Sequence, residues 1–311
     1  MKAAGEYLGL AAVLAVLVAF FSLNTGHFFS FASFQTMANQ IPDTLIVAVG
    51  MTGVLLIGGI DLSVGSVMAL GGAVLGVSAL ALHMPLPIAV LLCLAAGLVC
   101  GGANALVAVR WSIPSFIVTL GMLEIARGGA YLITDSRTQY LGQGLSAIAE
   151  PGLFGLSLAF LVSIVVVAIG QVIVSFTTFG RYMLAVGTSE ESARLSGINT
   201  TRVRAGVFIT SGLLSAVAGV VQCARLSASD PNAGIGLELQ AIAAVVIGGT
   251  TLLGGRGSVI GSFFGVLVIA VMENGLAQMG AQEPTKRVIT GCVIVLAVIV
   301  DYYRHRFGKK Q

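Results

Sequence analysis

Long apolar runs alternate with short polar or glycine-containing stretches along the whole chain. A membrane-spanning helix needs about 20 mostly apolar residues, and the pattern predicts ten such helices. They are expected at about residues 7–23, 42–59, 62–82, 86–109, 114–134, 156–176, 205–224, 238–253, 258–278 and 287–303. The strands of a membrane β-barrel would instead alternate polar and apolar residues over segments of about ten. The pattern therefore predicts an all-α, polytopic integral membrane protein with about ten transmembrane helices.

The composition agrees with this class. Hydrophobic residues make up 57% of the 311 residues and charged residues 9%, whereas soluble domains carry roughly 25% charged residues. The mean hydropathy is +1.00. We expect residues 1–311 to form a single transmembrane domain in a lipid bilayer. The four cysteines and three histidines show no metal-ligand spacing, so we expect no metal or cofactor on this chain. The net charge of +3 does not indicate a nucleic-acid partner.

The distribution of basic residues predicts the orientation. Loops on the cytoplasmic side of a membrane protein are enriched in Lys and Arg. With ten spans and a cytoplasmic N-terminus, eleven of the 16 basic residues fall inside: Lys2, Arg110, Arg181, Arg194, Arg202, Arg204, Arg256, Arg304, Arg306, Lys309 and Lys310. Four fall outside: Arg137, Arg225, Lys286 and Arg287. The first run is followed by no A-x-A-like cleavage site, so it is expected to remain as a helix. Both termini are expected in the cytoplasm.

The longest polar stretch between predicted spans, residues 179–204, contains a short helix with good end signals. They are Ser189 as N-cap, Glu190 and Glu191 in the first turn, Arg194 in the last turn and Gly197 just past the end. The two acids and the arginine each lie at the end of the helix dipole that stabilises their charge. A capped helix of this length on the cytoplasmic face requires a surface to pack against. We expect a partner to contact its apolar and small positions, Ala193, Leu195 and Gly197.

The segment IGGIDLSVG places a carboxylate between two long apolar runs. Gly58 and Gly59 are expected to end one helix. Asp61 is then expected to cap the next helix, which would begin at Leu62, because an N-cap aspartate accepts hydrogen bonds from free backbone N–H groups. The alternative is that Asp61 and the nearby Ser63 line a transport pathway, since broken helices in membranes often border a cavity.

Glu124 and Arg127 are charged residues inside the fifth predicted span. Their i, i+3 spacing places them on one side of a helix, so they are expected to form an ion pair. One interpretation is a buried structural pair, because a single charge in the membrane costs about 2.5–3.5 kcal/mol on insertion scales. The other is a pair facing an aqueous pathway, which an ion-coupled transporter could use as a proton relay.

No nucleotide-binding motif is present. The glycine-rich stretch GGTTLLGGRGSVIG (248–261) lacks the GK[ST] of a phosphate-binding loop and predicts a tight cytoplasmic turn. LSGIN (195–199) lacks the glycine pair of the transport-ATPase motif LSGGQ. If the protein pumps a solute, the energy must come from a partner. The triplets IGG and GSV at 57–59 and 65–67 recur at 247–249 and 257–259, which leaves an internal duplication open.

Three blocks resemble the ribose-type sugar permeases of ATP-binding cassette (ABC) transporters, a family that includes arabinose, xylose and galactose permeases. The blocks are GMTGVLLIGGIDLSVGSVMALGG (50–72), GRYMLAVGTSEESARLSGIN (180–199) and LELQAIAAVVIGGTTLLGGRGSVIGSFFG (237–265). The resemblance implies an importer made of two permease copies, ABC ATPase subunits and a periplasmic sugar-binding protein. It also implies that residues 189–199, within the segment 180–204, form the coupling helix that docks on the ATPase. The adjacent acids Glu190 and Glu191 differ from many relatives.

We therefore expect a permease subunit of the bacterial inner membrane that imports a monosaccharide or similar small polar solute, with ATP hydrolysed by another subunit. This chain itself is not expected to be an enzyme. The alternatives are an ion-coupled secondary transporter, which would use Glu124 and Arg127, and a passive channel. The sequence does not identify the solute.

Overall fold

The computed structural model describes residues 2–282, 284–293 and 295–296 of the chain. Its α-helices are α1 (Lys2–Asn24), α2 (Phe31–Gln40), α3 (Pro42–Leu56), α4 (Val64–Leu80), α5 (Leu86–Arg110), α6 (Ser115–Ile133), α7 (Ser146–Ala149), α8 (Leu158–Phe176), α9 (Thr178–Thr188), α10 (Glu190–Leu195), α11 (Thr200–Leu226), α12 (Leu237–Ile247) and α13 (Val259–Gln278). Residues 284–293 are also helical. Two short strands, β1 (Gln139–Tyr140) and β2 (Ala228–Ser229), pair antiparallel. The described part of the chain is thus all-α apart from this two-residue ladder and one isolated bridge between Pro151 and Ser157.

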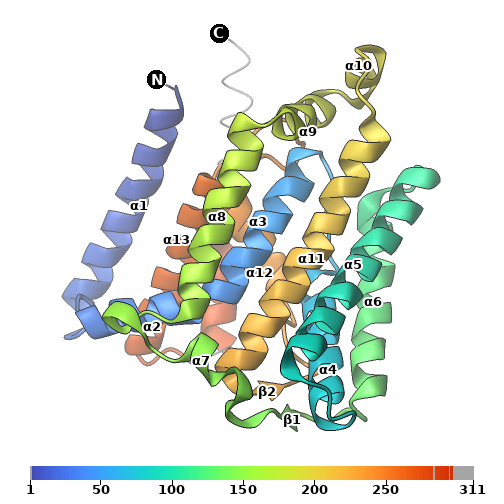
Figure 1. Cartoon of the computed structure of the whole chain (residues 1–311). Helices are drawn as coiled ribbons and strands as arrows, with labels where there is room; N and C mark the ends of the chain where they lie inside the picture. Colours follow the sequence, from blue (N-terminus) through green and yellow to red (C-terminus); the bar gives the residue numbers. More distant parts are fainter. Residues whose placement is uncertain (1, 283, 294, 297–311) are drawn as a thin grey trace.

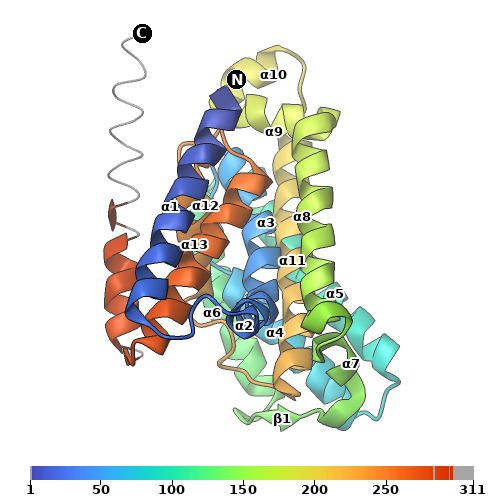
Figure 2. The ribbon, with the colours of Figure 1, turned by 90° about the vertical axis from the view of Figure 1, so that its left-hand side faces the viewer.

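Most of the long helices run between two opposite ends of the molecule (Figure 1). The first turn of α1, together with α9 and α10, lies at one end, which we call the α10 end. The strands β1 and β2 lie with α2 and α7 at the other, which we call the β end. The view in Figure 2 shows the same two ends and places α1 beside α13. The segments around residues 190 and 145 therefore lie at opposite ends of the molecule, as the charge distribution predicts.

Within the residues that the structure describes, five helices are long and apolar enough to cross a membrane, namely α5, α6, α8, α11 and α13. The pair α2 and α3 makes a sixth span if its 52° bend is counted within one crossing. This establishes a multi-pass membrane protein. The predicted span at 287–303 lies mostly outside the described residues, so the total of ten remains a prediction.

Two predicted spans, 62–82 and 238–253, are not full-length helices. At 1.5 Å per residue, the 11 residues of α12 cover about 16 Å of a hydrocarbon core about 30 Å thick. The helix α4 is also short, with 17 residues. Non-helical segments, 57–63 and 230–236, precede α4 and α12. Each of the two apolar runs contains a helix, but the runs do not show where the helices break, and the two crossings remain predictions.

The helix α11 forms the centre of the bundle and packs against α3, α4 and α5. About two thirds of the apolar window of α11 is buried, whereas α5, α6 and α8 each bury less than a third of theirs. Its contact with α5 depends on glycine: a Cβ added to Gly97 would lie 2.4 Å from the carbonyl oxygen of Gly212, and one added to Gly212 would lie 2.3 Å from that of Gly97. Small residues allow two membrane helices to approach this closely.

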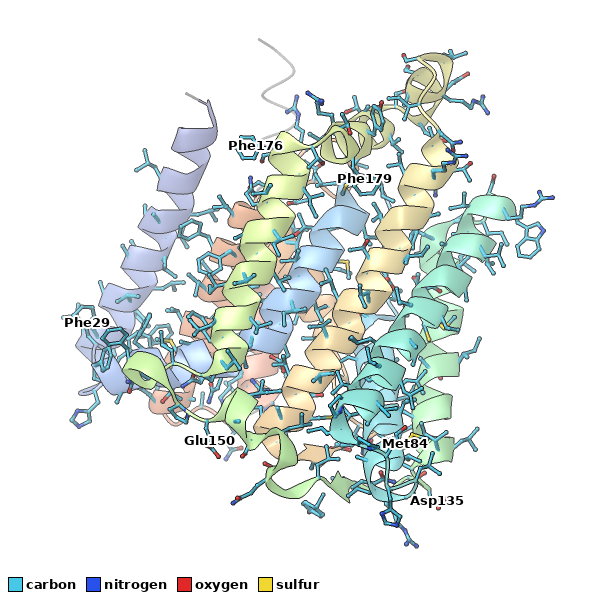
Figure 3. The ribbon with its side chains drawn as sticks, viewed as in Figure 1. Phe29, Met84, Asp135, Glu150, Phe176 and Phe179 are labelled. Carbon is cyan, nitrogen blue, oxygen red and sulfur yellow. The ribbon has the colours of Figure 1, made fainter. Side chains whose placement is uncertain are left out.

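The polar stretch 179–204 holds two helices, although the sequence predicts one. The additional helix, α9, begins after Thr177, whose hydroxyl oxygen accepts a hydrogen bond from the Gly180 N–H. Figure 3 shows Phe176 and Phe179 at the corner between α8 and α9, at the α10 end. Asp135 and Glu150 lie at the opposite end in the same view. Because α9 is amphipathic and buries Met183 and Val186, it packs across the end of the bundle rather than extending into solvent.

Candidate functional site

The helix α10 has the predicted boundaries and both predicted end signals. The hydroxyl oxygen of Ser189 accepts a hydrogen bond from the Ser192 N–H at 3.2 Å, which makes Ser189 the N-cap. Gly197 has φ +83°, and its N–H donates to the carbonyl of Arg194 at 3.0 Å. A residue with this left-handed backbone is most often glycine, and it ends the helix. The local prediction is confirmed, while the role of α10 in coupling remains a prediction.

The residues of α10 divide into those that hold it to the bundle and those that remain accessible. Glu190 forms an ion pair with Arg204 of α11 at 2.7 Å. Ala193 is 4% exposed and belongs to an apolar cluster with residues of α9 and α11. The protein's own core therefore covers Ala193, and contact of a partner with this residue stays a prediction without support from its accessibility. Leu195 is 80% exposed, and Gly197 is exposed as well.

Gly58 and Gly59 end α3, as predicted. The Gly58 N–H donates to the carbonyl of Leu55, and the Gly59 N–H donates to that of Val54, each at 2.9 Å. Gly58 has φ +70°. This pair of bonds is the Schellman arrangement of helix C-termini. The second IGG triplet also ends a helix, α12, but there the residue with positive φ is its last glycine, Gly249 (φ +90°), so the two copies are out of register by one position.

The glycine-rich loop 248–258 forms a tight turn against the end of α3. The Gly255 N–H donates to the carbonyl of Leu56 at 2.9 Å. A Cβ added to Gly254 would lie 2.7 Å from the backbone nitrogen of Gly58 and 2.9 Å from the carbonyl oxygen of Gly187. The interpretation as a turn between two helices therefore agrees with the contacts of this loop.

Asp61 is buried, 2% exposed, but it is not the N-cap of α4. That helix begins at Val64, with Ser63 in the cap position, so the predicted start at Leu62 is wrong by two residues. The Asp61 Oδ1 atom accepts from the Ser63 N–H at 2.9 Å and from the Ser63 hydroxyl at 2.6 Å. Its Oδ2 atom accepts from the Ser211 hydroxyl of α11 at 2.8 Å. Asp61 therefore holds the end of segment 57–63 that precedes α4 and ties it to α11.

Side chains from two further helices bond three more polar groups of segment 57–63. The Asn104 Nδ2 group of α5 donates to the Ser63 hydroxyl at 3.0 Å. The α6 hydroxyl oxygens of Ser115 and Thr119 accept from the N–H groups of Ile60 and Leu62, each at 3.0 Å. Non-helical backbone is tolerated in a membrane where protein groups replace the missing helical bonds. The sequence does not reveal these partners, because Asn104 lies on the predicted span 86–109 and the two hydroxyls lie on the predicted span 114–134.

The predicted Glu124–Arg127 pair is absent. The Arg127 Nη1 atom donates instead to the carbonyls of Pro231 at 2.6 Å and Ala233 at 2.7 Å. Glu124 is exposed, and it takes part in no ion pair within the part of the chain that the structure describes. The physical reason is that segment 230–236 lies outside regular helix, so its carbonyls need donors, and a guanidinium carries five.

The short helices α4 and α12 begin next to each other in the bundle. A Cβ added to Gly65, in the first turn of α4, would lie 2.2 Å from the carbonyl oxygen of Gly234 and 2.7 Å from the Oε2 atom of Glu238. Glu238 is in the first turn of α12. Helix N-termini carry partial positive charge, so the Glu238 carboxylate compensates two of them at this junction.

Two adjoining cavities lie beside this junction, with volumes of about 570 Å³ and 260 Å³. They share four lining residues: Gln40, Thr44, Gln240 and Glu273. We call the combined cavity the polar groove. Arg225 and Asp43, which form an ion pair at 3.0 Å, also line it. The groove cannot be recognised from the sequence, because its polar residues come from six helices that each contribute only one or two.

Comparisons with known proteins give one consistent result. Residues 33–298 match the family described as branched-chain amino acid transport system / permease component. The ribose import permease of Haemophilus influenzae is 36% identical over 93% of this chain and 91% of its own length. The ribose import permease of Escherichia coli K12 is 37% identical over the same shares. The fructose import permease of Rhizobium meliloti is 33% identical over 92% of this chain and 82% of its own. No solved structure matches the chain.

Proposed function

We propose that this chain, which belongs to the family of branched-chain amino acid transport system permease components, is the membrane subunit of an ABC importer for a monosaccharide or similar small polar solute. The observation that carries the proposal is similarity over more than nine-tenths of the chain to permeases named for ribose and fructose import. The absence of a nucleotide motif from the sequence supports a division of labour, in which a separate subunit hydrolyses ATP.

In this proposal the α10 end faces the cytoplasm of a bacterium and the β end faces outward from the inner membrane. The eleven-to-four distribution of basic residues supports that orientation. The ATPase subunit docks at the accessible side of α10, a periplasmic sugar-binding protein docks at the β end, and a second copy of this chain completes a homodimeric pathway. Both termini are cytoplasmic, and this chain binds no cofactor.

An ion-coupled mechanism loses its main support. That alternative depended on a pair formed by Glu124 and Arg127, and Arg127 binds backbone carbonyls instead. The structure therefore offers no paired acid and base at this position for a proton relay.

The test uses the complete transporter, with its ATPase and binding protein, in sealed vesicles that enclose ATP. D-ribose, D-fructose and L-arabinose are the probes. Leu195→Glu changes an exposed side chain, so protein level and thermal stability should stay at wild-type values. Uptake and co-purification of the ATPase should fall together. Tyr140→Glu, at a position equally exposed on the β end, is the matched control and should retain the ATPase.

Two results would overturn the proposal. One is uptake that continues without ATP and collapses with the proton gradient. The other is a Leu195→Glu complex that holds the ATPase and transports as the wild type does. Ala193→Glu is a useful contrast, because Ala193 is buried and a charge there should destabilise the protein itself.

A further inference from the structure

The polar groove gathers several hydrogen-bonding side chains among the apolar helices of the bundle. It lies in the half of the bundle nearest the β end, between the junction of α2 and α3, the last turns of α11 and α13, and α12. Its deep wall contains Met68, Gly234 and Leu237, at the point where α4 and α12 begin. Polar groups at membrane depth are costly and mark solute or ion pathways. Discontinuous helices mark them as well.

The groove offers amides and a hydroxyl rather than unpaired charges. Gln222 is half-buried in the central helix α11, and its side chain has no hydrogen-bond partner among the residues that the structure describes. Gln240 donates to Glu273 at 2.9 Å. Each amide carries two donor hydrogens and an acceptor oxygen, a combination that matches a sugar hydroxyl, which both donates and accepts.

Two of the charges that line the groove, on Arg225 and Asp43, compensate each other within the protein, and Glu273 and Lys286 line it as well. The Arg225 guanidinium binds the Asp43 carboxylate through Nη2 and the Gln40 carbonyl through Nη1. An amino acid would require a free anion partner for its ammonium and a free cation partner for its carboxylate. A neutral polyhydroxylated molecule requires neither. The cavity of about 570 Å³ falls within the usual range for small-molecule sites, roughly 300–1,000 Å³.

We propose that the polar groove is the solute-binding site of the permease, and that Gln222 and Gln240 form hydrogen bonds with the hydroxyl groups of a neutral monosaccharide. This inference rests on the proposed function and adds the location and ligand chemistry of the site. Access from the β end would let a sugar enter from the side on which a binding protein releases it. The junction of α4 and α12 then forms the floor of the site.

The inference can be tested by the protection of introduced cysteines in the complete transporter. Cys93, Cys100 and Cys223 are buried, so Cys292→Ser alone removes the exposed native thiol. In that background, Gln222→Cys and Gln240→Cys report on the groove. Gln143→Cys, at an exposed turn of the β end, is the matched control. A charged, membrane-impermeant methanethiosulfonate is added from outside with D-ribose, D-fructose, L-arabinose or L-leucine.

The transported sugar should slow modification at positions 222 and 240 several-fold and leave position 143 unchanged, while L-leucine protects neither. Gln222→Leu should raise the sugar concentration needed for half-maximal ATPase stimulation several-fold, with normal assembly, and Gln222→Asn should restore part of the difference. Protection by L-leucine alone would overturn the ligand class. Protection by none of the probes, in vesicles that import one of these sugars with ATP, would overturn the site and leave the proposed function standing. Vesicles that import L-leucine with ATP, and none of the sugars, would contradict the proposed function itself.

Discussion

Substitutions at Asp61 can distinguish two roles for its buried carboxylate. One role is to hold the non-helical segment before α4 in place, and the other is to line the transport path. Its oxygens accept one hydrogen bond from a backbone N–H and two from hydroxyls, on Ser63 and Ser211. Asp61→Leu removes all three acceptors. Asp61→Asn keeps Oδ1 in place for Ser63 and places an NH₂ group opposite the Ser211 hydroxyl, which can rotate and accept. The two variants therefore differ in how many polar groups they leave unpaired.

The size of the effect follows from the number of unpaired groups. The Ser63 N–H cannot reorient, and a buried unsatisfied donor costs about 1–3 kcal/mol, while each lost hydroxyl bond costs about 0.5–1.5 kcal/mol. Asp61→Leu should therefore lower the free energy of unfolding by roughly 2–6 kcal/mol, a large share of a typical total of about 5–15 kcal/mol. Asp61→Asn should cost at most about 1.5 kcal/mol, because one hydroxyl only has to rotate.

Thermal stability of the purified protein in detergent and sugar uptake by vesicles are the two measurements. The Tm should decrease in the order wild type, Asp61→Asn, Asp61→Leu, and uptake should follow the amount of folded protein. Asp135→Asn, in an exposed loop, is the control and should change neither quantity. An Asp61→Leu protein with wild-type Tm would refute the account of the network. An Asp61→Asn protein that is stable but inactive would assign the carboxylate to the transport path.

Two further predictions concern α6 and α11. Arg127→Met should lower the Tm and expose segment 230–236 to proteolysis, because two hydrogen bonds from a charged donor are lost at about 1.5–3 kcal/mol each. Glu124→Gln, on an exposed side chain, should stay within about 0.5 kcal/mol of wild type, and an equal loss in both variants would restore the ion-pair interpretation. Gly212→Val should destabilise the contact between α5 and α11 by about 1–3 kcal/mol, measured as a lower Tm. Gly102→Ala, with no atom within 4 Å of the added Cβ, should leave the Tm unchanged, and a Gly212→Val protein as stable as that control would contradict the close approach.

The features that could be predicted from the sequence are those encoded locally. Each long apolar run that lies in the described residues contains a helix, because burial in lipid requires internal backbone bonding. The end signals of α10 act within a few residues of each other, so Ser189 and Gly197 could be assigned without any tertiary information. The glycines that end α3 are local signals of the same kind.

The features that could not be predicted depend on contacts between distant residues. Arg127 binds carbonyls 104 and 106 positions further along the chain, whereas helical spacing pointed to Glu124, three positions away. Ala193 has the same small side chain whether a partner or the protein's own core covers it. The break before α12 is also hidden, because local composition does not show that the groups of an irregular segment have partners elsewhere.

Both irregular segments nevertheless bind to the same helix, α6, through residues that are regularly spaced along it. Ser115 and Thr119 hold segment 57–63, while Arg127 and Tyr131 hold segment 230–236, the latter through a bond of 2.8 Å from the tyrosine hydroxyl to Asn232. All four residues belong to the i, i+4 row of α6, a row that is inclined to the helix axis and forms a natural packing ridge. Glu124 lies outside that row. Because most of the remaining surface of α6 is exposed, these four residues indicate which side of the helix faces protein. Because α6 holds the segments before both α4 and α12, we expect a displacement of α6 to shift both helix N-termini beside the polar groove.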